Sequence, residues 1–104
     1  MATELAQFTI LYPDWYDDRA EFEAKSKGYL PGIVVQLADG SRHALYFIEP
    51  VRLGQDLQTE TEQKRPYLAE PGMVVIPEVS TQAVQTAVAG LFQDGYFDHL
   101  KPTD

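Results

Sequence analysis

The sequence contains no cysteine among its 104 residues. This absence excludes a disulfide framework, thiolate catalysis and any metal site that depends on cysteine ligands. Small secreted domains often need disulfides for stability, so a cysteine-free chain of this length favours the reducing cytoplasm. We therefore expect a cytoplasmic protein that is stabilised by its hydrophobic core alone.

Long apolar runs are missing as well. The longest are Ala44–Ile48 and Met73–Pro77, and both are far too short to cross a bilayer. Near the N-terminus, Glu4 stands where a secretory signal would carry basic residues. The sequence therefore predicts neither a membrane span nor a targeting segment.

Positive charge is scarce. Eight lysine and arginine residues face sixteen aspartate and glutamate residues, which leaves a net charge of −8. Nucleic-acid binding requires a basic surface, yet Lys64 and Arg65 are the only adjacent basic pair. We expect binding to neither nucleic acid nor an anionic membrane. An acidic surface favours a basic protein partner, or serves solubility alone.

Hydrophobic residues are plentiful by contrast. They make up 44% of the chain, and aromatic residues 12%. Such a composition supports one closed core, and the length leaves no room for a second. Residues 1–104 are therefore expected to form a single domain.

Proline and glycine divide the chain into alternating predicted strands and helices. Runs rich in β-branched and aromatic residues predict four strands, over residues 8–12, 33–38, 43–49 and 73–76. Asp39-Gly40 lies between the second and third runs and predicts a two-residue hairpin turn.

Three helices are expected, over residues 17–27, 50–63 and 80–95. Asp18 and Glu21 resemble a capping box at the start of the first helix. Ser80 is a typical cap for the last helix, and Gly95 is a typical end. The first helix has only a thin apolar stripe, whereas the last carries a broad apolar face.

The order of elements is strand, helix, strand, strand, helix, strand, helix. This order predicts an α+β fold, a ferredoxin-like βαββαβ sandwich with an additional C-terminal helix and a four-stranded, mainly antiparallel sheet. The first and third strands are apolar on both faces, which favours central places for them. Other strand orders stay open. The last helix is expected to cover its own sheet, with self-association through its apolar face as the alternative.

Motifs for catalysis, metal binding or phosphate binding are absent. Ser41 follows Gly40 in a predicted hairpin, without the strand–turn–helix context of a nucleophile elbow. His43 and His99 lack the helical spacing of a metal-binding pair. The acids lack the spacing of a calcium loop. We therefore identify no catalytic residues, expect no metal and no cofactor, and favour a non-enzymatic protein over an enzyme.

The densest group of acids is interleaved with aromatic residues at the predicted first strand–helix junction. Rigid aromatic rings give a large contact area, and carboxylates select basic partners. This segment is the candidate partner-binding site. The alternative is structural, with the acids at the helix start and the tryptophan covering the core. The residues are Asp14, Trp15, Tyr16, Asp17 and Asp18.

Two functions follow from these observations. The first is a non-enzymatic interaction module, such as an inhibitor, an immunity-type partner or a regulatory subunit. The alternative is a small-ligand-binding or enzymatic domain that uses an open sheet face. Tyr12, His43 and Tyr46 are the candidate ligand-binding residues if they line one cavity.

Overall fold

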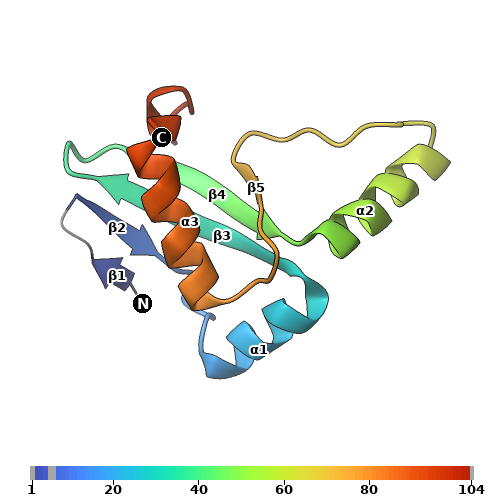
Figure 1. Ribbon diagram of the computed structural model, residues 1–104, viewed down its shortest axis with the longest axis horizontal. Helices are drawn as coiled ribbons and strands as arrows, with labels where there is room; N and C mark the ends of the chain where they lie inside the picture. Colours follow the sequence, from blue (N-terminus) through green and yellow to red (C-terminus); the bar gives the residue numbers. More distant parts are fainter. Residues whose placement is uncertain (1, 5–6, 104) are drawn as a thin grey trace.

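The computed structural model describes residues 2–4 and 7–103. Figure 1 shows a sheet with helices disposed around it. The strands are β1 (Ala2–Glu4), β2 (Phe8–Leu11), β3 (Tyr29–Leu37), β4 (Arg42–Ile48) and β5 (Met73–Val75). The helices are α1 (Asp18–Lys27), α2 (Pro50–Glu62) and α3 (Thr81–Gln93), followed by a 3-10 turn, η1 (Tyr96–Asp98).

The strands follow one another across the sheet in chain order, from β1 to β5. Neighbours are antiparallel except β4 and β5, which are parallel. The predicted α+β class and mainly antiparallel sheet are therefore confirmed. All four expected strands form, and the short β1 extends the sheet beyond β2.

The ferredoxin-like strand order is wrong. That order would place β4 between β2 and β3, whereas here the two pair directly, with Ile10 opposite Val35. A crossover requires a helix that packs on the sheet face, but α1 buries only Ala24. It lies beyond one end of the sheet instead (Figure 1). Gly28, in the left-handed conformation, then turns the chain straight into β3.

Strand β3 begins four residues earlier than expected. The strand includes Pro31 and Gly32, where the register shifts between Leu30 and Ile33. Gly32 has a φ of 81°, which the irregularity requires. The β3–β4 hairpin is confirmed, but its loop has three residues. Leu37 pairs with Ser41, and Gly40 alone takes a positive φ in the turn.

Helix α3 covers one face of the sheet (Figure 1). Its Val84 and Val88 are fully buried, so the prediction that the last helix packs on its own sheet is confirmed. After Gly95 the chain folds back and buries Phe97. The core beneath α3 comes from alternate strand residues, which include Ile10, Leu30, Ile33, Val35, Leu45 and Phe47.

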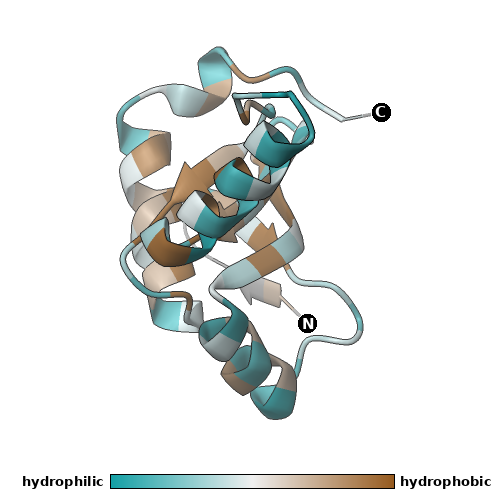
Figure 2. Ribbon diagram, turned by 90° about the vertical axis from the view of Figure 1, so that its right-hand side faces the viewer, coloured by the Kyte–Doolittle hydropathy of each residue, from teal (hydrophilic) through white to brown (hydrophobic). Residues whose placement is uncertain are grey.

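The opposite face of the sheet is much less covered. Leu11, Val34 and Ala44 lie in register across β2, β3 and β4 on this face. Ala44 is exposed and Tyr46 is half-buried, so the interpretation of β4 as apolar and buried on both faces is wrong. In Figure 2 the strands carry hydrophobic colours, whereas most of α2 is hydrophilic.

Helix α2 extends away from the rest of the molecule (Figure 1). It contains no buried residue, and the chain returns to β5 through residues 63–72, most of which are exposed. The molecule is therefore elongated, with extents of 43 × 32 × 23 Å. None of the helices within residues 2–4 and 7–103 combines the length and apolar character needed to cross a membrane.

Candidate functional site

Trp15 is displayed by a tight turn between β2 and α1. The amide of Tyr16 donates a hydrogen bond to the carbonyl of Pro13, at 3.0 Å, so Asp14 and Trp15 hold the central positions of the turn. The Trp15 side chain is 55% exposed. It therefore presents part of a rigid aromatic surface to solvent, while its ring also meets the buried Tyr16 edge-on, with centroids 6.4 Å apart.

Tyr16 is not part of this surface, although the sequence placed it in the candidate site. Its side chain is 3% exposed and stacks on Tyr12, with ring centroids 5.0 Å apart. Its hydroxyl lies 2.7 Å from the hydroxyl of Thr81 at the start of α3. Burial raises the pKa of Tyr16. The ring joins the turn before α1 to α3 and is inaccessible to a partner.

The three aspartates of the candidate site differ in role. Asp17, not Asp18, is the N-cap of α1, because its carboxylate accepts a hydrogen bond from the Ala20 amide at 2.8 Å. Asp18 lies in the first helical turn, and Asp14 lies in the preceding turn; both are exposed. Asp14 and Asp18 are therefore the carboxylates that best suit contact with a partner.

A hollow of about 330 Å³ opens beside Trp15, between α1 and β3. Its walls combine aromatic and aliphatic groups with a carboxylate and an ammonium group at the rim. It suits an inserted apolar side chain next to charged neighbours. The lining residues are Trp15, Ala20, Glu23, Ala24, Lys27, Tyr29 and Pro31.

Negative charge is concentrated in the segment that contains Trp15. Residues 14–23 contain five acidic side chains and one basic side chain, Arg19, so this segment holds half of the net charge of −8. Arg19 pairs with Glu23 at 3.3 Å, but its side chain is 87% exposed. Such an exposed pair contributes little, so a partner's basic group can replace Arg19. We call Asp14, Trp15, Asp18 and Glu23 the Trp15 surface.

The three candidate ligand-binding residues do not share a cavity. Tyr12 and His43 are buried on the α3 side of the sheet, at 6% and 2% exposure. Tyr46 lies on the other face, where it pairs in register with Met73. Burial and the nearby charge of Glu70 raise the pKa of Tyr46 to about 12, so its hydroxyl stays protonated at neutral pH.

Asp39, Ser41 and His43 lie close together at the β3–β4 hairpin. The Ser41 hydroxyl is 2.6 Å from the Asp39 carboxylate and 3.4 Å from Nε2 of His43. In a catalytic triad the carboxylate orients the histidine, whereas here it holds the serine. Nδ1 of His43 has no hydrogen-bond partner among the residues described, and the ring packs on Phe97. This arrangement stabilises the turn and lacks the order of groups that activates a nucleophile.

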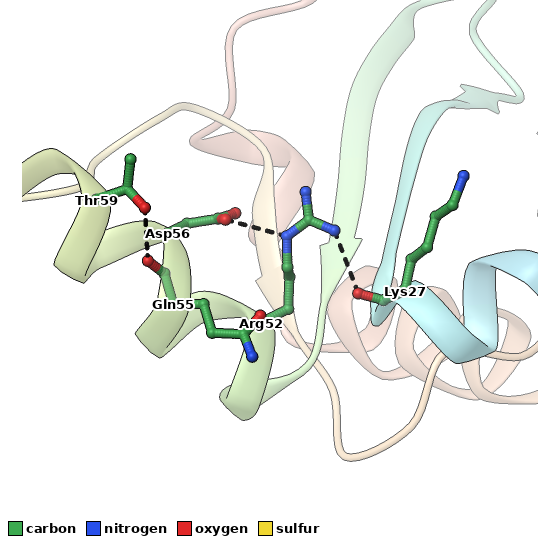
Figure 3. A network of polar contacts seen from close by, with 5 residues as sticks. All are labelled: Lys27, Arg52, Gln55, Asp56 and Thr59. Atoms are coloured by element: carbon green, nitrogen blue, oxygen red, sulfur yellow. Dashed lines mark hydrogen bonds and ion pairs between the residues drawn. The ribbon is translucent and has the colours of Figure 1, made fainter.

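A polar cluster fixes the base of α2 (Figure 3). Arg52 donates to the Asp56 carboxylate at 3.0 Å and to the carbonyl of Lys27 at 3.3 Å. Its guanidinium lies 5.1 Å from the centroid of the Tyr29 ring, which in turn packs edge-on against Tyr46. This cluster was not predicted from the sequence. The spacing of Arg52 and Asp56 on a predicted helix was a signal for their pairing, but nothing marked Tyr29.

A larger hollow, of about 480 Å³, lies between residues 76–80 and α3. Glu78 is the one charged side chain that lines it, and this carboxylate already pairs with Lys25 of α1. The pairing raises the pKa of Lys25. This hollow therefore has no free charged group to orient a ligand.

No group of three or more metal-ligating side chains is found in the part of the chain that the structure describes. No family model matches the chain, and the searches of curated proteins and of solved structures likewise found no match. The candidate site therefore rests on its own geometry.

Proposed function

We propose that this chain is a non-enzymatic protein-interaction module, of regulatory or immunity type, that binds a basic segment of another protein. The observation that supports this most is Trp15, a 55% exposed side chain held by a turn beside a hollow and flanked by free carboxylates. Exposed aromatic anchors with complementary charges around them are typical of protein-binding surfaces.

The Trp15 surface suits a partner segment with two chemical features. An apolar side chain of the partner fits the hollow between Trp15 and Tyr29. Lysine or arginine residues on either side of it would face Asp14 and Asp18. The apolar anchor supplies affinity, and the charges supply rapid encounter and selectivity for basic partners.

Comparative affinity capture tests this proposal. The wild-type chain is immobilised and a native lysate is applied at low salt. We expect a stoichiometric basic protein that is released by salt, because exposed charge pairs are screened. A double variant, D14N/D18N, should retain about tenfold less of it, since each lost pair is worth up to about 1 kcal/mol. Asp17 is left unchanged because it caps α1.

A matched control removes the same charge elsewhere. Glu62 and Asp94 are exposed and lie outside α1, so the E62Q/D94N variant changes the net charge equally. It should capture the partner as the wild type does. Equal loss from both variants would mean that only the overall charge matters and would overturn the proposed site.

Trp15 also provides a direct signal, because it is the only tryptophan in the chain. Binding of the captured partner should shift the Trp15 emission, and W15A should bind at least tenfold more weakly. A partner that binds W15A as tightly as the wild type would show that Trp15 is not the anchor.

A further inference from the structure

A second surface, separate from the Trp15 surface, leaves apolar groups uncovered. Six large hydrophobic side chains are exposed among the described residues, and four of them lie on α2 or between α2 and the end of β5. Val51 is 67% exposed and Leu57 40%. Tyr67 is 58% exposed on the chain that returns from α2, and Val75 is 48% exposed at the end of β5. We call residues 50–71 the α2 arm.

The accessible surface of the molecule is larger than that of a compact protein of the same mass. Its accessible surface is 6804 Å² at 11.7 kDa, whereas a compact monomer of this mass exposes about 5900 Å². Its radius of gyration is 14.1 Å, against about 12.9 Å for a compact chain of this length. The excess of about 900 Å² is close to the area that one partner loses in a standard protein interface, about 800 Å².

Charge distribution favours a second copy of the chain as the occupant. The α2 arm contains three basic and four acidic side chains, a net charge of −1 out of −8. Two arms can therefore approach with little repulsion, whereas the acidic segment 14–23 repels its own copy. A self-complementary contact uses the same patch on both molecules, so near-neutrality of that patch is the condition it must meet.

The local structure of α2 also favours a second copy of the chain as the partner. Gly54 weakens the helix, and a 13-residue helix of this composition is marginal without packing. A Cβ atom added at Gly54 would meet nothing within 4 Å, so another helix can approach its backbone closely. Val51 and Leu57 lie three residues from Gly54 on either side, which places them on neighbouring parts of the helix surface.

We propose that two copies of this chain form a symmetric dimer in which α2 packs against α2 of the partner copy. Val51 and Leu57 form the apolar centre, and the helices cross near Gly54. Arg52 holds α2 outward through the Lys27 carbonyl, so the arm is positioned before the copies meet. The Trp15 surface lies on α1 and the turn before it, and it stays free in the dimer.

Sedimentation equilibrium of the full chain, from about 1 µM to about 1 mM, tests the dimer. We expect a reversible monomer–dimer equilibrium, and L57E should raise the dissociation constant at least tenfold. F22E is the matched control, because Phe22 is 70% exposed on α1, outside the arm. Its dissociation constant should match that of the wild type. A monomer throughout the range, or equal weakening by F22E, would overturn the proposal.

Cross-linking gives a second measurement, and it does not require the chain to accept a charged side chain on α2. Because the chain lacks cysteine, V51C places a single thiol on α2, and F22C places one on α1. A short bismaleimide should join two V51C chains much faster than two F22C chains. Equal rates for the two variants would mean that the copies do not meet through α2.

Discussion

Glu21 shows how one side chain can join two helices. It belongs to α1, yet its carboxylate accepts the Thr81 amide at 2.7 Å, at the N-terminus of α3. The hydroxyl and amide of Thr81 lower the pKa of Glu21. The positive end of the α3 dipole favours the same negative charge. Glu21 was recognised from the sequence as a capping residue, but it caps α3 and not its own helix.

We therefore expect E21Q to lower the free energy of unfolding by about 1 kcal/mol at neutral pH. The pKa of Glu21 is lowered on folding, so its contribution is complete above its ordinary value of 4.5. This contribution is lost as the pH falls through the lowered pKa. Urea unfolding at several pH values should show the wild type and E21Q converging in acid.

Glu23 supplies the control for this prediction. It lies on the same helix, but its pairing with Arg19 is exposed. E23Q should therefore cost less than about 0.5 kcal/mol. If E21Q were as stable as E23Q at neutral pH, the bond to Thr81 would not join the helices in solution.

Single residues also mark the limit of sequence interpretation for the candidate site. Trp15 and Tyr16 are adjacent aromatic residues in one acidic segment, and no local pattern separates them. The structure separates them because the turn after Pro13 directs Trp15 outward, while Tyr16 stacks on the nearby Tyr12 and meets Thr81, 65 residues further along the chain. Long-range partners of this kind leave no local pattern.

Helix α2 buries no residue, and Arg52 links it to two other elements. Arg52 and Arg65 make similar interactions, since each pairs with an acid of α2 and lies over a tyrosine ring. The contacts of Arg65 are local, whereas Arg52 reaches the Lys27 carbonyl of α1 and the Tyr29 ring of β3. The outward position of α2 therefore depends on Arg52.

R52A should accordingly loosen α2 without unfolding the core. We expect amide hydrogen exchange in α2 to accelerate about tenfold, which corresponds to the loss of about 1.4 kcal/mol of local stability. Exchange in α3 should stay unchanged, because its Val84 and Val88 remain buried. R65A is the control, and it should affect only the last turn. Equal protection of α2 in R52A and in the wild type would contradict this role.

The helices and strands were largely predictable because their signals are local. The runs of β-branched residues, the caps and the glycine stops predicted three helices and four strands close to their observed ranges. Strand order was not predictable in the same way. Strand order depended on whether α1 covers the sheet. The thin apolar stripe of α1 was the sequence signal against a crossover helix, and in the structure Ala24 is the one residue that this helix buries.

At the scale of the whole molecule, negative charge is distributed unevenly. Half of the net charge of −8 lies within residues 14–23, and the α2 arm is nearly neutral. The two proposed contacts therefore respond to salt in opposite directions. Salt should weaken binding of a basic partner at the Trp15 surface, and it should tighten the α2 dimer by screening the remaining charge of the two copies.

The same charge acts on the stability of the monomer. Like charges repel within a folded acidic chain, whereas most ion pairs among the described residues are exposed, so screening should stabilise it. We expect the Tm to rise by a few degrees between low salt and about 0.3 M salt, since 1 kcal/mol shifts the Tm of such a domain by about 4–8 °C.

Calorimetry should use dilute protein, because dimerisation also raises the Tm. D14N/D18N should respond less than the wild type, because it has already lost part of the repulsion. A Tm that falls with salt would mean that pairs such as Lys25–Glu78 and Arg52–Asp56 outweigh the repulsion.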